Sequence, residues 1–140
     1  MVEEPDQVLP LSKPLPTPEI SVVIPVFNEE ENLRELGERL IRTLTAMGRP
    51  FEIIFVDDGS TDGSWELLAD LNRHYPENIR ALQFHRNFGQ HQAIFAGFQA
   101  ARGQVMVTLD ADLQNPPEEI PRLVAKLEEG YDTVGGWREN

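Results

Sequence analysis

The sequence predicts an α/β domain with a mostly parallel β-sheet and helices on both faces of the sheet. Two observations carry this prediction. Short, nearly continuous apolar runs rich in β-branched residues alternate with longer segments whose apolar residues recur at helical spacing. Such runs are typical of strands that are covered on both faces, as parallel strands are when helices connect them.

The first two strands are predicted at Ile20 to Phe27 and at Phe51 to Val56, and both runs are almost entirely apolar. Asn28 follows the first strand and can cap a helix with an acidic first turn, which the helix dipole favours. The apolar pattern of this helix ends at Gly48, a residue type common at helix ends. A second helix, with apolar residues between Trp65 and Leu71, follows the second strand.

Two further strands are predicted at Ile79 to Phe84 and at Val105 to Leu109, with a helix of small residues from Gln92 to Ala101 between them. The next helix is predicted from Glu118 to Glu129, and a fifth strand from Tyr131 to Val134. Strands and helices therefore alternate along the chain, which is typical of a doubly wound parallel sheet.

Two regions differ in character. Residues 1–19 are rich in proline and have no hydrophobic pattern, so a disordered or loosely packed leader is expected there. Residues 20–140 are expected to form one domain. We expect this domain to be truncated on its C-terminal side, because the chain stops after a strand-like stretch with no closing helix.

The composition narrows the class of protein. The chain has 12 Lys and Arg against 24 Asp and Glu, a formal net charge of −12, which argues against nucleic acid and anionic lipid as direct partners. The absence of cysteine excludes disulfides and thiolate metal sites. No apolar run approaches the roughly 20 residues needed to span a bilayer, so no membrane segment is expected and a cytoplasmic chain is predicted.

An acidic pair follows the fourth predicted strand. Asp110 and Asp112 are separated only by the small residue Ala111. In a turning backbone, alternate side chains can converge on one ion, and hard cations such as Mg²⁺ or Mn²⁺ prefer oxygen ligands. The competing interpretation is a solvated acidic turn that caps the next helix.

Polar residues also follow the first and second strands, as Asn28-Glu29 and Asp57-Asp58. If the strand order is 3-2-1-4, the first and fourth strands are neighbours, and the polar groups meet at the carboxyl edge where open parallel sheets bind ligands. No glycine-rich phosphate loop follows the first strand, which argues against dinucleotide and P-loop sites. A diphosphate held through a metal ion needs no such loop.

Four segments, taken together and in order, resemble the family-2 glycosyltransferases with the Rossmann-like GT-A fold, and more narrowly the polyprenyl-phosphate glycosyltransferases. They are VVIPVFNEEENL (22–33), VDDGSTDGS (56–64), RNFGQ (86–90) and DADLQNPPEEIP (110–121). The resemblance implies metal-dependent, inverting transfer of a sugar from a nucleotide-diphosphate donor, expected to be UDP-linked, to a polyprenyl phosphate. It also implies that full-length relatives act at the cytoplasmic face of the inner membrane.

The resemblance further implies a nucleotide-sugar site. Carried over by position, Pro25, Phe27 and Glu29 are expected to line the nucleotide pocket. Val56 and Asp58 are expected to contact the base and the ribose.

The same resemblance implies a metal site on the acidic pair. Asp110 and Asp112, with Ala111 between them, match the pair that holds a divalent cation on the donor diphosphate. Gln114 fits a third ligand, and Arg138 stands where these enzymes carry an arginine after the fifth strand. Either Mg²⁺ or Mn²⁺ is expected.

Several alternatives remain open on the sequence alone. Asp57 is either the turn former of the Asp-Gly-Ser corner or a ligand residue, and no general base is identified. The chain is either a transferase domain or a donor-binding fragment without turnover, and a homo-oligomer is possible. A less favoured alternative is a haloacid-dehalogenase-type phosphatase with Asp110 as nucleophile, a family that expects Thr or Val where Gln114 stands.

Overall fold

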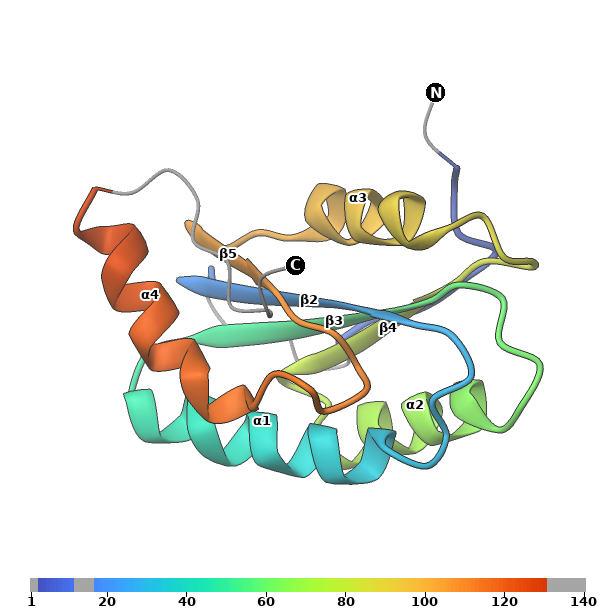
Figure 1. Ribbon diagram of the computed structural model, residues 1–140, viewed down its shortest axis with the longest axis horizontal. Coiled ribbons are helices and arrows are strands. Elements are labelled where there is room, and N and C mark those ends of the chain that lie inside the picture. Colours follow the sequence, from blue (N-terminus) through green and yellow to red (C-terminus); the bar gives the residue numbers. More distant parts are fainter. Residues whose placement is uncertain (1–2, 12–16, 131–140) are drawn as a thin grey trace.

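The computed structural model describes residues 3–11 and 17–130 and shows a sheet between two layers of helices (Figure 1). The strands are β1 (Gln7–Leu9), β2 (Ile20–Val26), β3 (Phe51–Asp57), β4 (Ile79–Gln83) and β5 (Val105–Thr108). The helices are α1 (Leu33–Met47), α2 (Ser64–His74), α3 (Gln90–Ala100) and α4 (Ile120–Glu128), with the short 3₁₀ helix η1 (Pro117–Glu119) before α4.

The strand order is β1-β4-β3-β2-β5. β2 pairs in parallel with both β3 and β5, and β3 pairs in parallel with β4. The predicted α/β fold class is therefore confirmed, and the four predicted strands that lie within the described residues adopt the order 3-2-1-4 that was considered for them. The carboxyl ends of β3, β2 and β5 lie side by side, at the side of the sheet that we call its carboxyl edge. The functional site lies at this carboxyl edge.

Strand β1 differs from the leader expected at residues 1–19. Gln7–Leu9 pairs antiparallel with β4, and the backbone N–H of Asp6 donates to the carbonyl of Gln83 at 2.6 Å. The sequence pattern missed this strand because an edge strand of three residues is held by its backbone hydrogen bonds and needs no apolar run. Val8, in its middle, is 50% exposed.

Each face of the sheet is covered by its own helices. Helices α1, α2 and α4 lie on one face and α3 lies on the other (Figure 1). In β2, Val22 and Ile24 belong to the core under α1, whereas Val23 belongs to the core under α3. Gly97 of α3 lets that helix come close, because a Cβ there would lie 2.3 Å from a methyl carbon of Val23.

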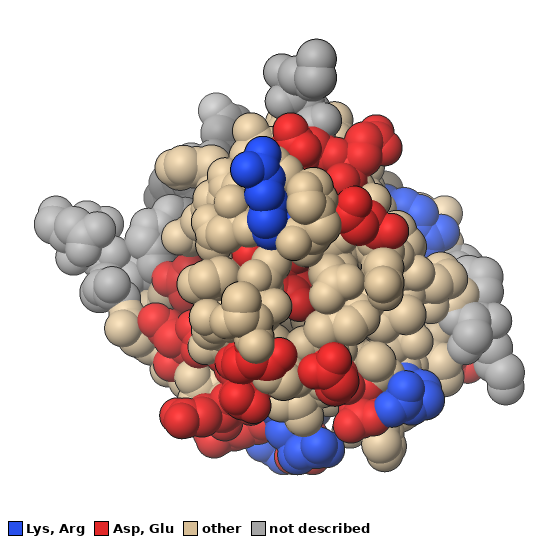
Figure 2. All heavy atoms as spheres, turned by 90° about the vertical axis from the view of Figure 1, so that its right-hand side faces the viewer, with Lys and Arg blue, Asp and Glu red and all other residues tan. Residues whose placement is uncertain are grey.

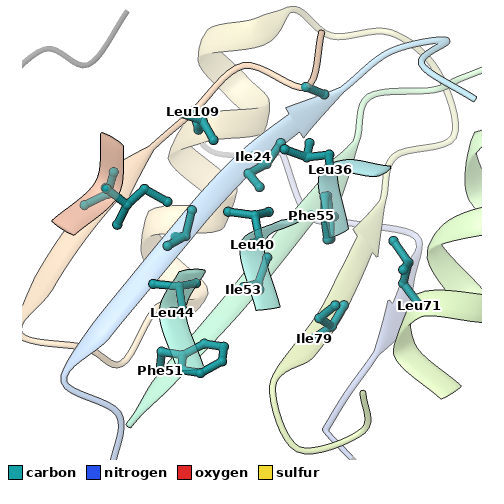
Figure 3. Close-up of a cluster of buried hydrophobic side chains, with 14 of the residues drawn as sticks. Ile24, Leu36, Leu40, Leu44, Phe51, Ile53, Phe55, Leu71, Ile79 and Leu109 are labelled. Atoms are coloured by element: carbon teal, nitrogen blue, oxygen red, sulfur yellow. The ribbon is translucent and has the colours of Figure 1, made fainter. Parts of the chain in front are cut away.

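Helix α1 supplies the largest stripe of apolar side chains to the first core. Leu36, Leu40 and Leu44 point from α1 onto Ile53 and Phe55 of β3 (Figure 3). All three leucines are buried. This packing is what the helical spacing predicted. It holds α1 along one face of the sheet, so that the loop before α1 lies at the carboxyl ends of the strands (Figure 1).

Helices α3 and α4 begin at residues other than those predicted. Helix α3 starts at Gln90 rather than Gln92, directly after Gly89, whose φ of 106° suits only glycine. The segment from Pro117 to Glu119 forms the 3₁₀ helix η1, so α4 starts after it. None of the helices within the described ranges has the length and apolarity to cross a bilayer. The predicted fifth strand at residues 131–134 lies outside the described residues.

Candidate functional site

A cavity of about 250 Å³ opens at the carboxyl ends of β2, β3 and β5. Figure 2 faces this edge and shows Asp and Glu side chains gathered around a hollow. The cavity is lined by residues from the end of β2, the loops that follow β2, β3 and β5, and the start of α3: Pro25, Val26, Phe27, Glu29, Asp58, Gln90, Asp110, Ala111 and Asp112.

The loop after β5 places both carboxylates of the acidic pair on the cavity. Asp110 and Asp112 line it, while Ala111 between them is buried with 3% exposure. The backbone N–H of Leu109 donates to the carbonyl of Val23 at 3.2 Å, which continues the pairing of β5 with β2 up to the acidic pair. The pair therefore begins where the sheet ends. Neither η1 nor α4 has a side-chain capping hydrogen bond, so the helix-capping role of the competing interpretation is not seen, while both carboxylates stay partly exposed to solvent.

The same loop turns sharply after Asp112. Leu113 has a φ of 66°, and the carboxylate of Asp112 accepts a hydrogen bond from the backbone N–H of Gln114 at 3.1 Å. The side chain of Gln114 is exposed and is not part of the cavity wall. Its role as a third metal ligand stays a prediction.

Asn28 clamps the loop after β2 to the loop after β3. Its side-chain Oδ1 accepts from the backbone N–H of Thr61 at 2.8 Å, and its own N–H donates to Ser60 Oγ at 2.8 Å. Next to it, the N–H of Glu29 donates to Ser64 Oγ at 2.9 Å. Asn28 adopts the left-handed conformation with a φ of 54°. The clamp fixes the residues on either side of Asn28 at the cavity wall.

This clamp corrects the expectation that Asn28 caps the following helix. Helix α1 begins at Leu33, and the residue before it, Asn32, makes no capping hydrogen bond through its side chain. The side chain of Asn28 is instead used on the neighbouring loop, which is a long-range contact that helix-start patterns do not reveal.

Asp58 holds the segment that leads from β4 into α3. Its two carboxylate oxygens accept hydrogen bonds from the backbone N–H groups of Phe88 at 2.8 Å and Gly89 at 3.0 Å. Its own N–H donates to the carbonyl of Val26 at 2.7 Å, which ties it to β2. Burial raises the pKa of the Asp58 carboxyl, and the two backbone donors offset part of that rise.

Asp57 and Val56 lie in the interior of the domain and not on the cavity wall. Both are fully buried, and neither lines the cavity. The Asp57 carboxylate accepts from the N–H of Ser60 at 2.9 Å, so it has the turn-forming role, and burial raises its pKa. The predicted binding roles of both residues thus have no support from the cavity geometry, because their side chains face the interior. Arg138 lies outside the described residues.

Most of the predicted site residues nevertheless come together. Seven of them line the one cavity: Pro25, Phe27, Glu29, Asp58, Asp110, Ala111 and Asp112. Sequence reasoning missed Val26 and Gln90. Gln90 could have been found from its place at the end of the RNFGQ segment, at the start of the helix that follows the third predicted strand.

The acidic pair suits a divalent cation that is shared with a ligand. Within residues 3–11 and 17–130, no three His, Asp or Glu side chains gather into a complete metal-binding cluster. Mg²⁺ in proteins commonly takes one or two carboxylates and completes its shell with water and substrate phosphates. Asp110 and Asp112 fit that pattern, because both reach a cavity with room for a phosphate-bearing ligand.

The two functions of Asn28 can be separated by mutation. Asn28→Gly removes the side-chain acceptor but suits a positive φ, so we expect a loss of about 1 kcal/mol in unfolding free energy. Asn28→Ala loses the same acceptor and keeps a Cβ in the left-handed region without the local hydrogen bonds that let Asn adopt it, so we expect it to cost roughly 1–2 kcal/mol more than Asn28→Gly. Urea unfolding of the two variants measures the difference. Equal losses for both variants would contradict the strained backbone assigned to Asn28.

Solved structures of other proteins share this fold. Residues 1–349 of TarS from S. aureus are 25% identical with a TM-score of 0.61, over 79% of this chain and 32% of that chain. Glucosyl-3-phosphoglycerate synthase from Mycobacterium tuberculosis, solved with UDP, is 27% identical with a TM-score of 0.59, over 81% of this chain and 41% of the synthase. The mannosyltransferase PcManGT from Pyrobaculum calidifontis, solved with GDP-Man and Mn²⁺, is 22% identical with a TM-score of 0.65, over 95% of this chain and 37% of that protein.

The chain therefore spans between about a third and two fifths of the length of these structures. The Rossmann-like GT-A fold expected from the sequence is confirmed by them. The sequence profile of glycosyl transferase family 2 matches residues 21–140, which include the whole of the cavity. The alternative of a haloacid-dehalogenase-type phosphatase has no support from this match. This chain belongs to glycosyl transferase family 2.

Proposed function

We propose that the cavity binds the nucleotide diphosphate of a sugar donor together with a divalent cation, and that the protein transfers the sugar to a polyprenyl phosphate. The observation that carries the proposal is the meeting of Asp58, Asp110 and Asp112, which come from two different loops, in one cavity. Complexes of relatives with UDP, GDP-Man and Mn²⁺ support the same class of ligand.

The strand order suggests how the donor lies. Phe27 and Asp58 stand on the β2 and β3 side of the cavity, and the acidic pair stands on the β5 side. Phe27 is 46% exposed, so its ring is free to pack against a flat base. Each oxygen of Asp58 already accepts one backbone N–H and keeps a further lone pair for a ribose or base donor. We assign the nucleoside to this side and the diphosphate to the side of Asp110 and Asp112.

Electrostatics favour a cation on the side of the cavity formed by Asp110 and Asp112. A diphosphate brought beside Asp110 and Asp112 meets like charge, in a chain whose formal net charge is already −12. When bound to these two carboxylates, Mg²⁺ or Mn²⁺ supplies Lewis-acid stabilisation of the departing diphosphate. Gln114 is proposed as a third ligand, which requires its exposed side chain to turn toward the loop. The chain's own contribution is to hold the two carboxylates at the cavity.

The acceptor is assigned from the motif resemblance. The four segments resemble those of the group of undecaprenyl-phosphate 4-deoxy-4-formamido-L-arabinose transferase, whose members act in lipid A modification at the cytoplasmic face of the inner membrane. In the proposed reaction, a phosphate oxygen of the lipid forms a bond to the anomeric carbon as the bond to the nucleotide diphosphate breaks, with inversion. A phosphate monoester is already anionic near neutral pH, so the step needs no protein general base.

Calorimetry with UDP and with GDP, each with and without Mn²⁺, tests the donor site. We expect binding to depend on Mn²⁺, and we expect Asp110→Asn and Asp112→Asn each to weaken it about tenfold or more, which is about 1.4 kcal/mol. Glu77→Gln is the matched control, because Glu77 is exposed and lies in the connection between α2 and β4, away from the cavity. Aspartate variants that bind Mn²⁺ and nucleotide like the unaltered chain would refute the site.

The acceptor requires a separate assay. The protein is incubated with the sugar nucleotide that calorimetry favours and with undecaprenyl phosphate, and lipid-linked sugar is measured by mass spectrometry. We expect a sugar phosphate lipid of inverted anomeric configuration. Donor binding with no lipid product is the result expected for the second candidate function, donor binding without turnover. Transfer to a hydroxyl acceptor, with none to the lipid phosphate, would contradict the assignment.

A further inference from the structure

Gln90 connects the acidic pair to the opposite side of the cavity. It is the first residue of α3, it lines the cavity, and its side-chain amide Nε2 donates to Asp110 Oδ1 at 3.4 Å. This distance is longer than the roughly 2.7–3.2 Å of most N–H···O bonds, and Gln90 is exposed to solvent. A polar residue that merely starts a helix would be equally exposed. Whether the contact with Asp110 is maintained therefore depends on how firmly the backbone of Gln90 is held.

That backbone is fixed by Asp58. The two N–H groups that precede Gln90, those of Phe88 and Gly89, both donate to the Asp58 carboxylate. Gly59 adds a close contact, because a Cβ there would lie 2.3 Å from the backbone carbonyl carbon of Arg86. The segment from residue 86 to residue 90 is thus attached to the loop after β3 by the Asp58 carboxylate and by the close approach of the Gly59 backbone.

The segment is also held by its aromatic residue. The ring of Phe88 packs edge to face on Phe84, with the ring centroids 5.5 Å apart, and the Arg86 guanidinium carbon lies 4.5 Å from the Phe88 ring centroid. The N–H of Phe84 donates to the carbonyl of Asp57 at 2.9 Å. The start of α3 therefore has contacts on both sides, and Gln90 projects from a fixed point toward Asp110.

We propose that Gln90 is a positioning residue for the metal site: its amide holds one oxygen of Asp110 and so orients the carboxylate toward the cation. This inference rests on the proposed function, because it assigns a role around the cation that Asp110 and Asp112 bind. Groups that hydrogen-bond to metal-ligating carboxylates tune metal affinity, and their loss typically costs 10- to 100-fold. Through Asp58, the same segment joins the nucleoside side of the cavity to the metal side.

Two substitutions test the reach of the amide. Gln90→Ala removes the donor. Gln90→Asn keeps an amide and suits a helix start, but its side chain is one methylene shorter. If Gln90 acts only as a polar helix-start residue, Asn preserves its role; if it bridges to Asp110, Asn fails as Ala does. Gln99→Ala is the matched control, since Gln99 is an exposed glutamine near the other end of α3.

The readout is Mn²⁺ binding, measured from the electron paramagnetic resonance signal of free Mn²⁺ with no nucleotide present and then with UDP. We expect Gln90→Ala and Gln90→Asn each to weaken Mn²⁺ binding about tenfold, with circular dichroism and melting temperature unchanged and with Gln99→Ala equal to the unaltered chain. Gln90 variants that bind Mn²⁺ normally overturn the inference alone. Failure of the unaltered chain to bind Mn²⁺, even with UDP, overturns both this inference and the proposed metal site.

Discussion

The parallel pairing of β2 with both β3 and β5 is the constraint on which the rest of the structure depends. Because all three strands run the same way, the loops that follow them end at one edge. Asp58 after β3 and Asp110 after β5 are brought together across the end of β2, although β3 and β5 do not pair with each other. The buried apolar face of α1 and the close approach of Gly97 hold this sheet from its two sides.

The same arrangement concentrates negative charge at the cavity. Hydrogen bonds within the loops offset this charge to different extents at the different carboxylates. The carboxylate of Asp58 is offset by two backbone N–H groups, and that of Asp112 accepts one from Gln114. Asp110 receives only the long contact from Gln90 among the hydrogen bonds described for it. Asp110 is therefore the carboxylate of the cavity with the weakest described hydrogen bonding, and the acidic pair is where a cation and the phosphates of a ligand would complete the electrostatics.

The sequence predicts much of this because the patterns that matter are local. Continuous apolar runs mark β2 and β3, helical spacing marks α1, and the position of Asp110 directly after a strand marks the site. What it could not predict depends on contacts between distant segments. Strand β1 is held by backbone bonds to β4, and Asn28 serves a neighbouring loop rather than its own helix. The side chain of Asp57 points into the interior, whereas that of the next residue, Asp58, lines the cavity, because successive side chains at the end of a strand point in opposite directions. The sequence did not show which of the two would face the cavity.

The central claim is that one cation lies between Asp110 and Asp112 on the side of the cavity that receives a diphosphate. Anomalous diffraction at the manganese absorption edge, from crystals grown with Mn²⁺ and UDP, tests it most directly. The account predicts an anomalous peak within ligand distance of both carboxylates and of a phosphate oxygen, with the uracil ring on the side of Phe27. A peak bound elsewhere, or nucleotide in the cavity with both aspartates turned away from it, would contradict the account.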